Sequence, residues 1–361
     1  MKLQSVSTRL VDVPLAKPIG TAIHQIRSVG CVLVEARSDD GAVGQSYVFA
    51  INANRLKAFD EMVNGLAEFA LVGADPHDTE GIWHQLWSEV NPTGHKGVTI
   101  SAMSTLDVAC WDLVGRAHGL PLHKMWGACR SAVPTYASSG LWLSQSVDEL
   151  VVEADSFVNE GFTAVKVRIG SDRAADDVER VRAVRDAVGD EIDVLADANQ
   201  KFTAKEAIRL GRALEEFNLL WLEEPVASYD LAGHARVRDA LDTPVASGET
   251  EYTRFGMQAM LDAGAADILM PDLQRIGGYS EFRKASATAS AQNIPISSHF
   301  FTEYSLCLAG ATENCISAEH IDWFAPLFNE TADLVDGCLI IPDRPGHGFT
   351  FDQDAVEHFA I

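Results

Sequence analysis

The sequence predicts an α/β protein built around a closed barrel of parallel strands, preceded by a smaller α+β unit. Three observations support this fold class. Asp197, Glu223 and Glu249 each follow a short apolar run, at an equal spacing of 26 residues that leaves room for one helix and two loops. From about Val133, strand-like and helix-like segments alternate, as in parallel βα units. About eight strands can be counted there, the number that a closed parallel barrel needs.

The smaller unit is expected at residues 1–128. Strand-like patterns at 6–14 and 31–37, with the turn signal Asp39-Asp-Gly41, predict antiparallel strands. Between these strands, residues 16–29 contain Pro18 and Gly20 and show weak periodicity, so we expect a loop. Helical patterns follow, interrupted by a second loop at 91–97.

The barrel is expected at residues 129–323. Its segments show the expected signals, for example the strand at 164–169 and the capping box Thr203-Ala-Lys-Glu206 at the start of a helix. Residues 324–361 are turn-rich, with a hairpin-like stretch at 343–348. We expect this last segment to return to the first domain.

The composition is that of an ordinary globular protein and narrows the possible functions. The chain has 361 residues and a formal net charge of −24, which argues against binding to nucleic acids or to anionic membranes. No basic, apolar leader and no run approaching a membrane span is present, so we expect a cytoplasmic protein. The six cysteines are scattered without a C-x-x-C pair, which favours reduced thiols over a disulfide framework or a zinc site.

The three equally spaced acids predict a metal site. Because the carboxyl ends of parallel strands meet at one rim, Asp197, Glu223 and Glu249 should lie close together. Converging carboxylates repel each other and raise each other's pKa values unless a cation lies between them. A hard, oxygen-seeking ion is the natural ligand of such a set, and we expect Mg²⁺.

Other strands of the predicted barrel also carry charged or titratable residues. Lys166 and Arg168, at i and i+2, share one face of their strand and should point into the barrel. Asp272 and His299 end neighbouring strands, where a carboxylate can fix the imidazole tautomer and strengthen it as a base. Glu319 ends the last strand and is a candidate proton donor if burial raises its pKa. The alternative for the two cations is a structural ion pair with the nearby acids.

Taken together, these motifs resemble those of the enolase superfamily. Within it, they resemble the mandelate racemase subgroup, whose mark is an Asp–His dyad on the sixth and seventh strands. The resemblance covers nearly the whole chain. It rests on the following residues: Lys166-Val-Arg168, Asp197-Ala-Asn199, Trp221-Leu-Glu-Glu-Pro225, Ser247-Gly-Glu249, Met270-Pro-Asp272, Ile276-Gly-Gly278, Ser297-Ser-His299 and Glu319.

The resemblance implies a modified TIM barrel, (β/α)7β, with an N-terminal capping domain completed by the C-terminal tail. It also implies Mg²⁺ held by the three acids named above and a small-molecule carboxylate substrate. Lys166, assisted by Ser138, would bind the substrate carboxylate, and Asn199 would support the site. His299, oriented by Asp272, would move the proton α to the carboxylate, which leaves an enediolate. Glu319 would donate a hydrogen bond or proton opposite the metal.

Arg168 departs from mandelate racemase itself, where a second lysine is the base on the opposite face. A guanidinium keeps its charge and cannot serve as that base. We therefore expect one-base chemistry, dehydration of an acid sugar to a 2-keto-3-deoxy product, with Arg168 orienting the substrate. The polar loop tips, His24 and Gln25 in one loop and His95 and Lys96 in the other, suit a hydroxylated substrate.

The alternatives are a racemase or epimerase of a 2-hydroxy acid, a cycloisomerase of a sugar-acid lactone, and a metal-binding scaffold without activity. The subgroup resemblance also implies a homo-oligomer, from dimer to octamer. The sequence does not identify the acid sugar.

Overall fold

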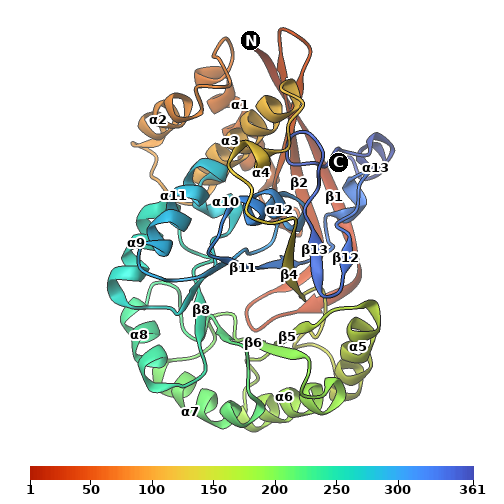
Figure 1. Ribbon diagram of the computed structural model, residues 1–361, viewed down its shortest axis with the longest axis vertical. Helices are drawn as coiled ribbons and strands as arrows, with labels where there is room; N and C mark the ends of the chain where they lie inside the picture. Colours follow the sequence, from red (N-terminus) through yellow and green to blue (C-terminus); the bar gives the residue numbers. More distant parts are fainter.

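The computed structural model describes all 361 residues and contains the predicted barrel. Its eight strands lie in chain order, are parallel, and close through a pairing of the last with the first. Figure 1 shows the helices α5 to α9 as an arc around the outside of the strands in the lower half of the view. The strands are β4 (Ala132–Ala137), β5 (Ala164–Arg168), β6 (Asp193–Asp197), β7 (Leu222–Glu223), β8 (Val245–Ser247), β9 (Ile268–Leu269), β10 (Ile296–Ser297) and β11 (Cys315–His320).

Seven helical connections join these eight strands, which confirms the (β/α)7β arrangement. Local sequence explains several of their ends: α7 opens with the predicted capping box of Thr203 and Glu206, and α5 opens with a second one from Ser146 and Glu149. The helices are α5 (Val147–Glu160), α6 (Ala174–Val188), α7 (Ala204–Leu214), α8 (Leu231–Ala240), α9 (Thr253–Ala263), the pair α10 (Leu273–Ile276) and α11 (Gly278–Ser290), and α12 (Thr302–Ala311).

The N-terminal part forms an antiparallel sheet covered by helices, as the fold class predicted. The sheet contains β1 (Leu3–Gly20), β2 (Gln25–Ser38) and β3 (Val43–Ile51), and the helices are α1 (Leu56–Ala70), α2 (Thr79–Val90), α3 (Val98–Ala117) and the short α4 (Leu122–Met125). One apolar cluster joins the outer face of this sheet to α1, α2 and α3, and a larger cluster joins its other face to the barrel.

The loop predicted at residues 16–29 is wrong. Most of this stretch belongs to a long β1–β2 hairpin, and only residues 21–24 form its turn. The ladder register shifts between Pro14 and Ile19, so Pro18 lies in a bulged stretch where its missing N–H breaks no ladder hydrogen bond. The hairpin carries the turn down to the barrel, where Figure 1 shows its tip beside the strands.

The C-terminal segment contacts both parts of the molecule. A hairpin of β12 (Leu334–Val335) and β13 (Cys338–Ile340) extends the barrel sheet beside β4, so the hairpin of this segment lies before the predicted stretch at 343–348. Further along, the His347 ring contacts the Gln45 carbonyl oxygen at 3.0 Å, and after α13 (Gln353–His358) a bridge joins Ala360 to Val11. The domain boundaries at 128/129 and 323/324 stay predictions.

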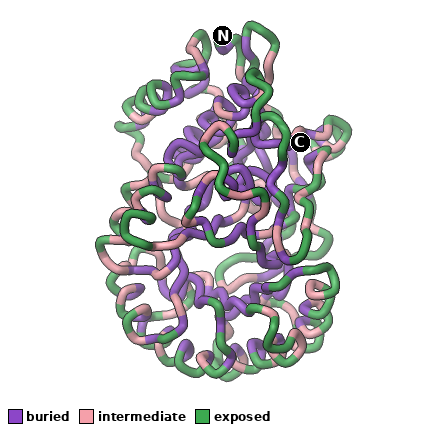
Figure 2. Tube along the Cα trace, viewed as in Figure 1, coloured by how far each residue is buried: buried purple, intermediate pink, exposed green.

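Buried residues fill the barrel below its mouth, as the purple trace in Figure 2 shows. A cluster of seven apolar residues occupies the interior, in which the rings of Tyr136 and Trp221 meet edge to face at 5.3 Å. Lys166 Nζ lies 5.4 Å from the centre of the Tyr136 ring. The polar site therefore rests on a packed apolar floor and opens only toward the N-terminal sheet. None of the helices is long and apolar enough to cross a lipid bilayer.

Candidate active site

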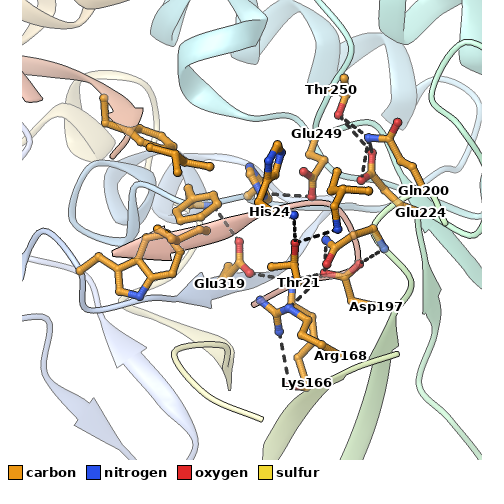
Figure 3. Close-up of a pocket in the computed structure, with 18 of the residues that line it drawn as sticks. Thr21, His24, Lys166, Arg168, Asp197, Gln200, Glu224, Glu249, Thr250 and Glu319 are labelled. Carbon is orange, nitrogen blue, oxygen red and sulfur yellow. Dashed lines mark hydrogen bonds and ion pairs between the residues drawn. The ribbon is translucent and has the colours of Figure 1, made fainter. Parts of the chain in front are cut away.

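The polar residues at the strand ends converge on one cavity of about 440 Å³ between the barrel mouth and the N-terminal sheet. Lys166, Arg168, Asp197, Glu249 and Glu319 line it from the barrel side, and Figure 3 shows them around a shared space. His299 and Asn199 also line it. The β1–β2 turn contributes Thr21 and His24 from the opposite side.

The backbone around the mouth carries unusual conformations. Asn199, Gln200, Glu224 and Phe300, each just beyond a barrel strand, have positive φ angles between 39° and 64° although none is glycine. Such conformations cost free energy and persist where the surrounding structure holds them. Gly248, with φ of 129°, allows the chain to turn before Glu249. Strained backbone of this kind is thus present where the functional side chains are placed.

Each of the three predicted metal ligands faces a cation. Glu223 Oε1 lies 2.8 Å from Lys166 Nζ, Asp197 Oδ2 lies 3.3 Å from Arg168 Nε, and Glu249 Oε2 lies 3.1 Å from His299 Nε2. In this arrangement no three His, Cys, Asp or Glu side chains are grouped closely enough to hold a metal ion.

The chemistry of the three acids nevertheless fits a hard divalent cation. They stand at the ends of the consecutive strands β6 and β7 and two residues beyond β8. Burial, opposed by Lys166 and reinforced by Asp197, raises the pKa of Glu223 to about 7. Carboxylates that destabilise one another's charged forms in this way are stabilised by a cation between them. Mg²⁺ would exchange their contacts with Lys166, Arg168 and His299 for its own.

Lys166 is buried and contacts three acids. Its Nζ lies 2.7 Å from Glu319 Oε1, in addition to the contact with Glu223, and 3.7 Å from Asp197 Oδ2. Burial lowers the pKa of Lys166, but these neighbours outweigh it and raise the pKa above its usual value. Lys166 is therefore a fixed cation rather than a base. The ion pairs considered as an alternative to a binding role are present in the structure.

Glu319 differs from its prediction. Burial does raise its pKa, but Lys166, His299 and Arg168 together lower it below the usual range. The condition on which Glu319 was expected to be a proton donor, a pKa raised by burial, is therefore not met in this arrangement, and its role stays a prediction. Its carboxylate accepts hydrogen bonds from Lys166 and from Ser138 Oγ at 2.6 Å, and from the Phe300 N–H at 2.7 Å.

Arg168 packs over an aromatic ring. Its guanidinium carbon is 4.5 Å from the centre of the Trp142 ring, and its Nη2 donates to Ser138 Oγ at 3.0 Å. Ser138 thus lies behind the cavity, between Arg168 and Glu319, rather than in its lining. Asn199 donates from its side chain to Asp197 Oδ2 at 3.1 Å, and its buried Oδ1 has no partner.

Asp272 and His299 form the expected pair. Asp272 Oδ2 lies 2.8 Å from His299 Nδ1, while its Oδ1 caps α10 by accepting the Arg275 N–H at 2.8 Å. Burial lowers the pKa of His299, but the charge of Glu249 and the hydrogen bonds that the ring donates to Asp272 and Glu249 raise it to about 10. The ring is therefore held with Nδ1 on the carboxylate and Nε2 toward the cavity.

The 91–97 loop does not reach the cavity. His95 instead stacks on Trp87, with ring centres 3.6 Å apart, and Lys96 Nζ lies 3.9 Å from Glu251. Gln25 also lies outside the lining. Of the four loop-tip residues expected to meet a hydroxylated substrate, only His24 lines the cavity.

Sequence reasoning missed two groups of lining residues. Arg275 Nη1 donates to the Glu249 carbonyl oxygen at 2.8 Å, and its position three residues after Asp272 could have indicated it. An aromatic wall of Trp142, Phe300 and Trp323 closes another side of the cavity, with the two tryptophan rings stacked at 5.6 Å. These aromatic residues come from three separate loops, and no sequence pattern connects them.

Comparisons with known proteins place this barrel and site in a family. The model of the mandelate racemase / muconate lactonizing enzyme N-terminal domain matches residues 4–127, and the enolase C-terminal domain-like model matches residues 149–355. The chain therefore belongs to the mandelate racemase / muconate lactonizing enzyme family, within the enolase superfamily.

Its relatives include enzymes that act on sugar acids. The chain is 34% identical to L-talarate/galactarate dehydratase of Salmonella typhimurium, over 98% of this chain and 90% of the relative. It is also 34% identical to 3,6-anhydro-alpha-L-galactonate cycloisomerase of Streptomyces coelicolor, over 99% of both. The crystal structure of L-talarate dehydratase from Polaromonas sp. JS666, with Mg and L-glucarate, has a TM-score of 0.94 at 32% identity and covers 100% of this chain and 97% of that one.

Proposed function

We propose that the protein is a Mg²⁺-dependent dehydratase of acid sugars that removes the proton α to the substrate carboxylate. The observation that carries the proposal is the Asp272–His299 pair, whose second ring nitrogen, Nε2, faces the carboxylates and cations of one cavity. Asp197, Glu223 and Glu249 would hold the metal ion. Mg²⁺, when bound, would neutralise the substrate carboxylate and make the α-proton more acidic.

Other residues of the site would bind and orient the substrate. Lys166 would bind a carboxylate oxygen and stabilise the charge of the enediolate as it develops, with Glu319 and Ser138 fixing its position. Arg168, held against Trp142, would orient the substrate. Asn199, through its unpartnered Oδ1, and His24, from the β1–β2 turn, would contact substrate hydroxyl groups.

His299 would serve as both base and acid. Its Nε2 takes the proton from the α carbon, the C–O bond at the β carbon breaks, and the same proton leaves with the hydroxyl group as water. The resulting enol then rearranges to the 2-keto-3-deoxy acid. Because Glu249 Oε2 occupies the hydrogen-bonding position at Nε2 in this structure, Glu249 must turn to another partner before Nε2 can accept a proton.

Arg168 disfavours racemisation as the main activity. Inversion at the α carbon needs competent bases on both faces, and a guanidinium stays protonated. A cycloisomerase is the second candidate, because the Streptomyces coelicolor relative, which aligns over 99% of both chains, is named as a cycloisomerase. Both the dehydratase and the cycloisomerase can work with one base.

The direct test is to incubate the Mg²⁺-loaded protein with a panel of acid sugars and trap 2-keto products with semicarbazide. A dehydratase yields a trapped 2-keto-3-deoxy acid from at least one substrate. Ring opening of a lactone or anhydro acid without loss of water would instead assign the cycloisomerase. No product and no α-hydrogen exchange, with metal bound, would contradict both enzymatic functions and favour a metal-binding scaffold.

The proposed homo-oligomeric state rests on the family resemblance, and the proposed cytoplasmic location rests on composition. Light scattering would measure the oligomeric state.

A further inference from the structure

The cavity has two chemically different ends. At the barrel rim, charged side chains are packed side by side, as Figure 3 shows for Lys166, Arg168, Asp197 and Glu319. On the side of the N-terminal sheet, the lining contains no lysine, arginine or acid. That side is lined instead by Thr21, Ile23, His24, Ile26, Phe49 and Ile51, with the aromatic wall of Trp142, Phe300 and Trp323 beside them.

Every lysine and arginine side chain of the lining lies at the barrel rim and already contacts a partner there. Lys166 contacts Glu223 and Glu319, and Arg168 contacts Asp197 and Ser138. Arg275 Nη1 donates to the Glu249 carbonyl oxygen and lies 3.7 Å from its carboxylate. None of these cations is left free to meet a group at the far end of a bound substrate.

Acids also outnumber lysines and arginines around the site. Besides these three cations and the protonated His299, the site contains six acids, which are at most 13% exposed: Asp197, Glu223, Glu224, Glu249, Asp272 and Glu319. A metal ion and Lys166 can balance one substrate carboxylate. A second carboxylate at the far end would find no lysine or arginine in the lining there, so it would lose hydration without gaining a charged partner. His24 is the one titratable group on that side, and it is exposed to solvent, where water screens its interactions.

We propose that this enzyme selects monocarboxylic acid sugars and discriminates against dicarboxylic ones. This inference rests on the proposed function and specifies its substrate class. The carboxylate end would lie at the rim, and the far end, against the isoleucines and aromatic rings, would be a neutral group such as a hydroxymethyl, a methyl or a ring ether. The chain would thereby differ from the Salmonella typhimurium relative, whose name gives two dicarboxylates as substrates.

The test compares an aldonate with the aldarate of the same configuration, which differs only in having a second carboxylate in place of the terminal hydroxymethyl group. Across several configurations, kcat/KM with Mg²⁺ should be about a hundredfold higher for the aldonate of each productive pair. Equal or better turnover of aldarates would overturn the inference but leave the dehydratase function standing. Turnover of neither member, with no α-hydrogen exchange, would instead remove the proposed function on which the inference depends.

A variant tests whether the missing positive charge, rather than the shape of the cavity, excludes dicarboxylic substrates. Ile23 lies in the β1–β2 turn, lines the cavity and is 52% exposed, so Ile23→Arg can introduce a cation at the far end without burying it. This change should raise kcat/KM for aldarates by about tenfold, with no matching gain for aldonates, and Ile23→Met should produce no such gain. If Ile23→Arg does not raise kcat/KM for aldarates, the proposed absence of a partner for a second carboxylate is wrong. The same conclusion follows if the wild-type protein turns over aldarates rapidly and His24→Gln loses that activity.

Discussion

His299 Nδ1 lies 2.8 Å from Asp272 Oδ2, and this contact joins the ends of two neighbouring barrel strands. Asp272 uses its other oxygen to cap α10, so its carboxylate is held from two sides and cannot follow the imidazole if the ring moves. The nitrogen that faces the cavity is consequently Nε2. The pair thus determines both the tautomer and the direction of the base.

Asp272→Asn tests this orientation. Asparagine is still a good N-cap for α10, but it carries no charge to stabilise the imidazolium and can present its amide to Nδ1. We expect kcat to fall by about 10²–10⁴-fold with little change in thermal unfolding temperature. If the loss of activity is accompanied by a large fall in the thermal unfolding temperature, Asp272 serves only to hold the fold.

Arg168→Lys tests the absence of a second base. A buried lysine can lose its proton, whereas arginine cannot, so this variant should gain slow epimerisation at the α carbon that the wild-type protein lacks. Chiral chromatography of recovered substrate detects the epimer. Arg168→Met, similar in length but without a basic nitrogen, is the control and should produce none. Epimerisation by the wild-type protein would contradict the assignment of one base.

Glu223→Gln tests the metal site independently of turnover. Replacing one of three carboxylate ligands with a neutral amide should weaken Mg²⁺ binding by at least about tenfold, measured by calorimetry on the protein after treatment with a chelator. The matched control is Glu224→Gln, since Glu224 lies beside it but accepts its hydrogen bonds from Gln200 and Thr250. Unchanged Mg²⁺ affinity in Glu223→Gln would remove this residue from the ligand set.

The buried His347 predicts how stability depends on pH. Burial, only partly opposed by Asp112, lowers the pKa of His347 from 6.5 to about 4. The unfolded chain therefore binds a proton between these values that the folded chain does not. Its effect on stability is absent above pH 6.5, and the free energy of unfolding decreases as the pH falls from 6.5 toward 4.

Chemical denaturation at several pH values measures this effect. His347→Gln should make the slope between pH 6.5 and 4 shallower, by an amount on the order of 2 kcal/mol over the window. Glutamine can still donate to the Gln45 carbonyl oxygen that contacts the His347 ring. Parallel curves for the two proteins would show that His347 does not contribute the lost stability.

Much of the fold and the barrel rim could be predicted because both follow from the regular alternation of strands and helices along the chain. Parallel strand ends meet at one rim, so equal spacing of Asp197, Glu223 and Glu249 predicted their neighbourhood, and adjacent strands predicted the contact of Asp272 with His299. The family matches confirm the resemblance on which the rest of the site was based.

Features that depend on packing between distant segments could not be predicted. The Pro18 stretch became strand because β2 pairs with it across a bulge, and a single-strand pattern does not reveal that partner. The pKa of Glu319 depends on Lys166, which reaches it across the barrel, so burial alone predicted the wrong direction. The wall of Trp142, Phe300 and Trp323 is likewise assembled from loops that follow three different strands.

The most direct test of the central claim, that His299 moves the α-proton, uses a substrate analogue lacking the β-hydroxyl group. Such an acid can lose its α-hydrogen but cannot eliminate water, so exchange alone is observed. In heavy water with Mg²⁺, NMR should show the wild-type protein replacing the α-hydrogen with deuterium, and His299→Asn should exchange it at least about a hundredfold more slowly. Exchange by His299→Asn at the wild-type rate would contradict the account.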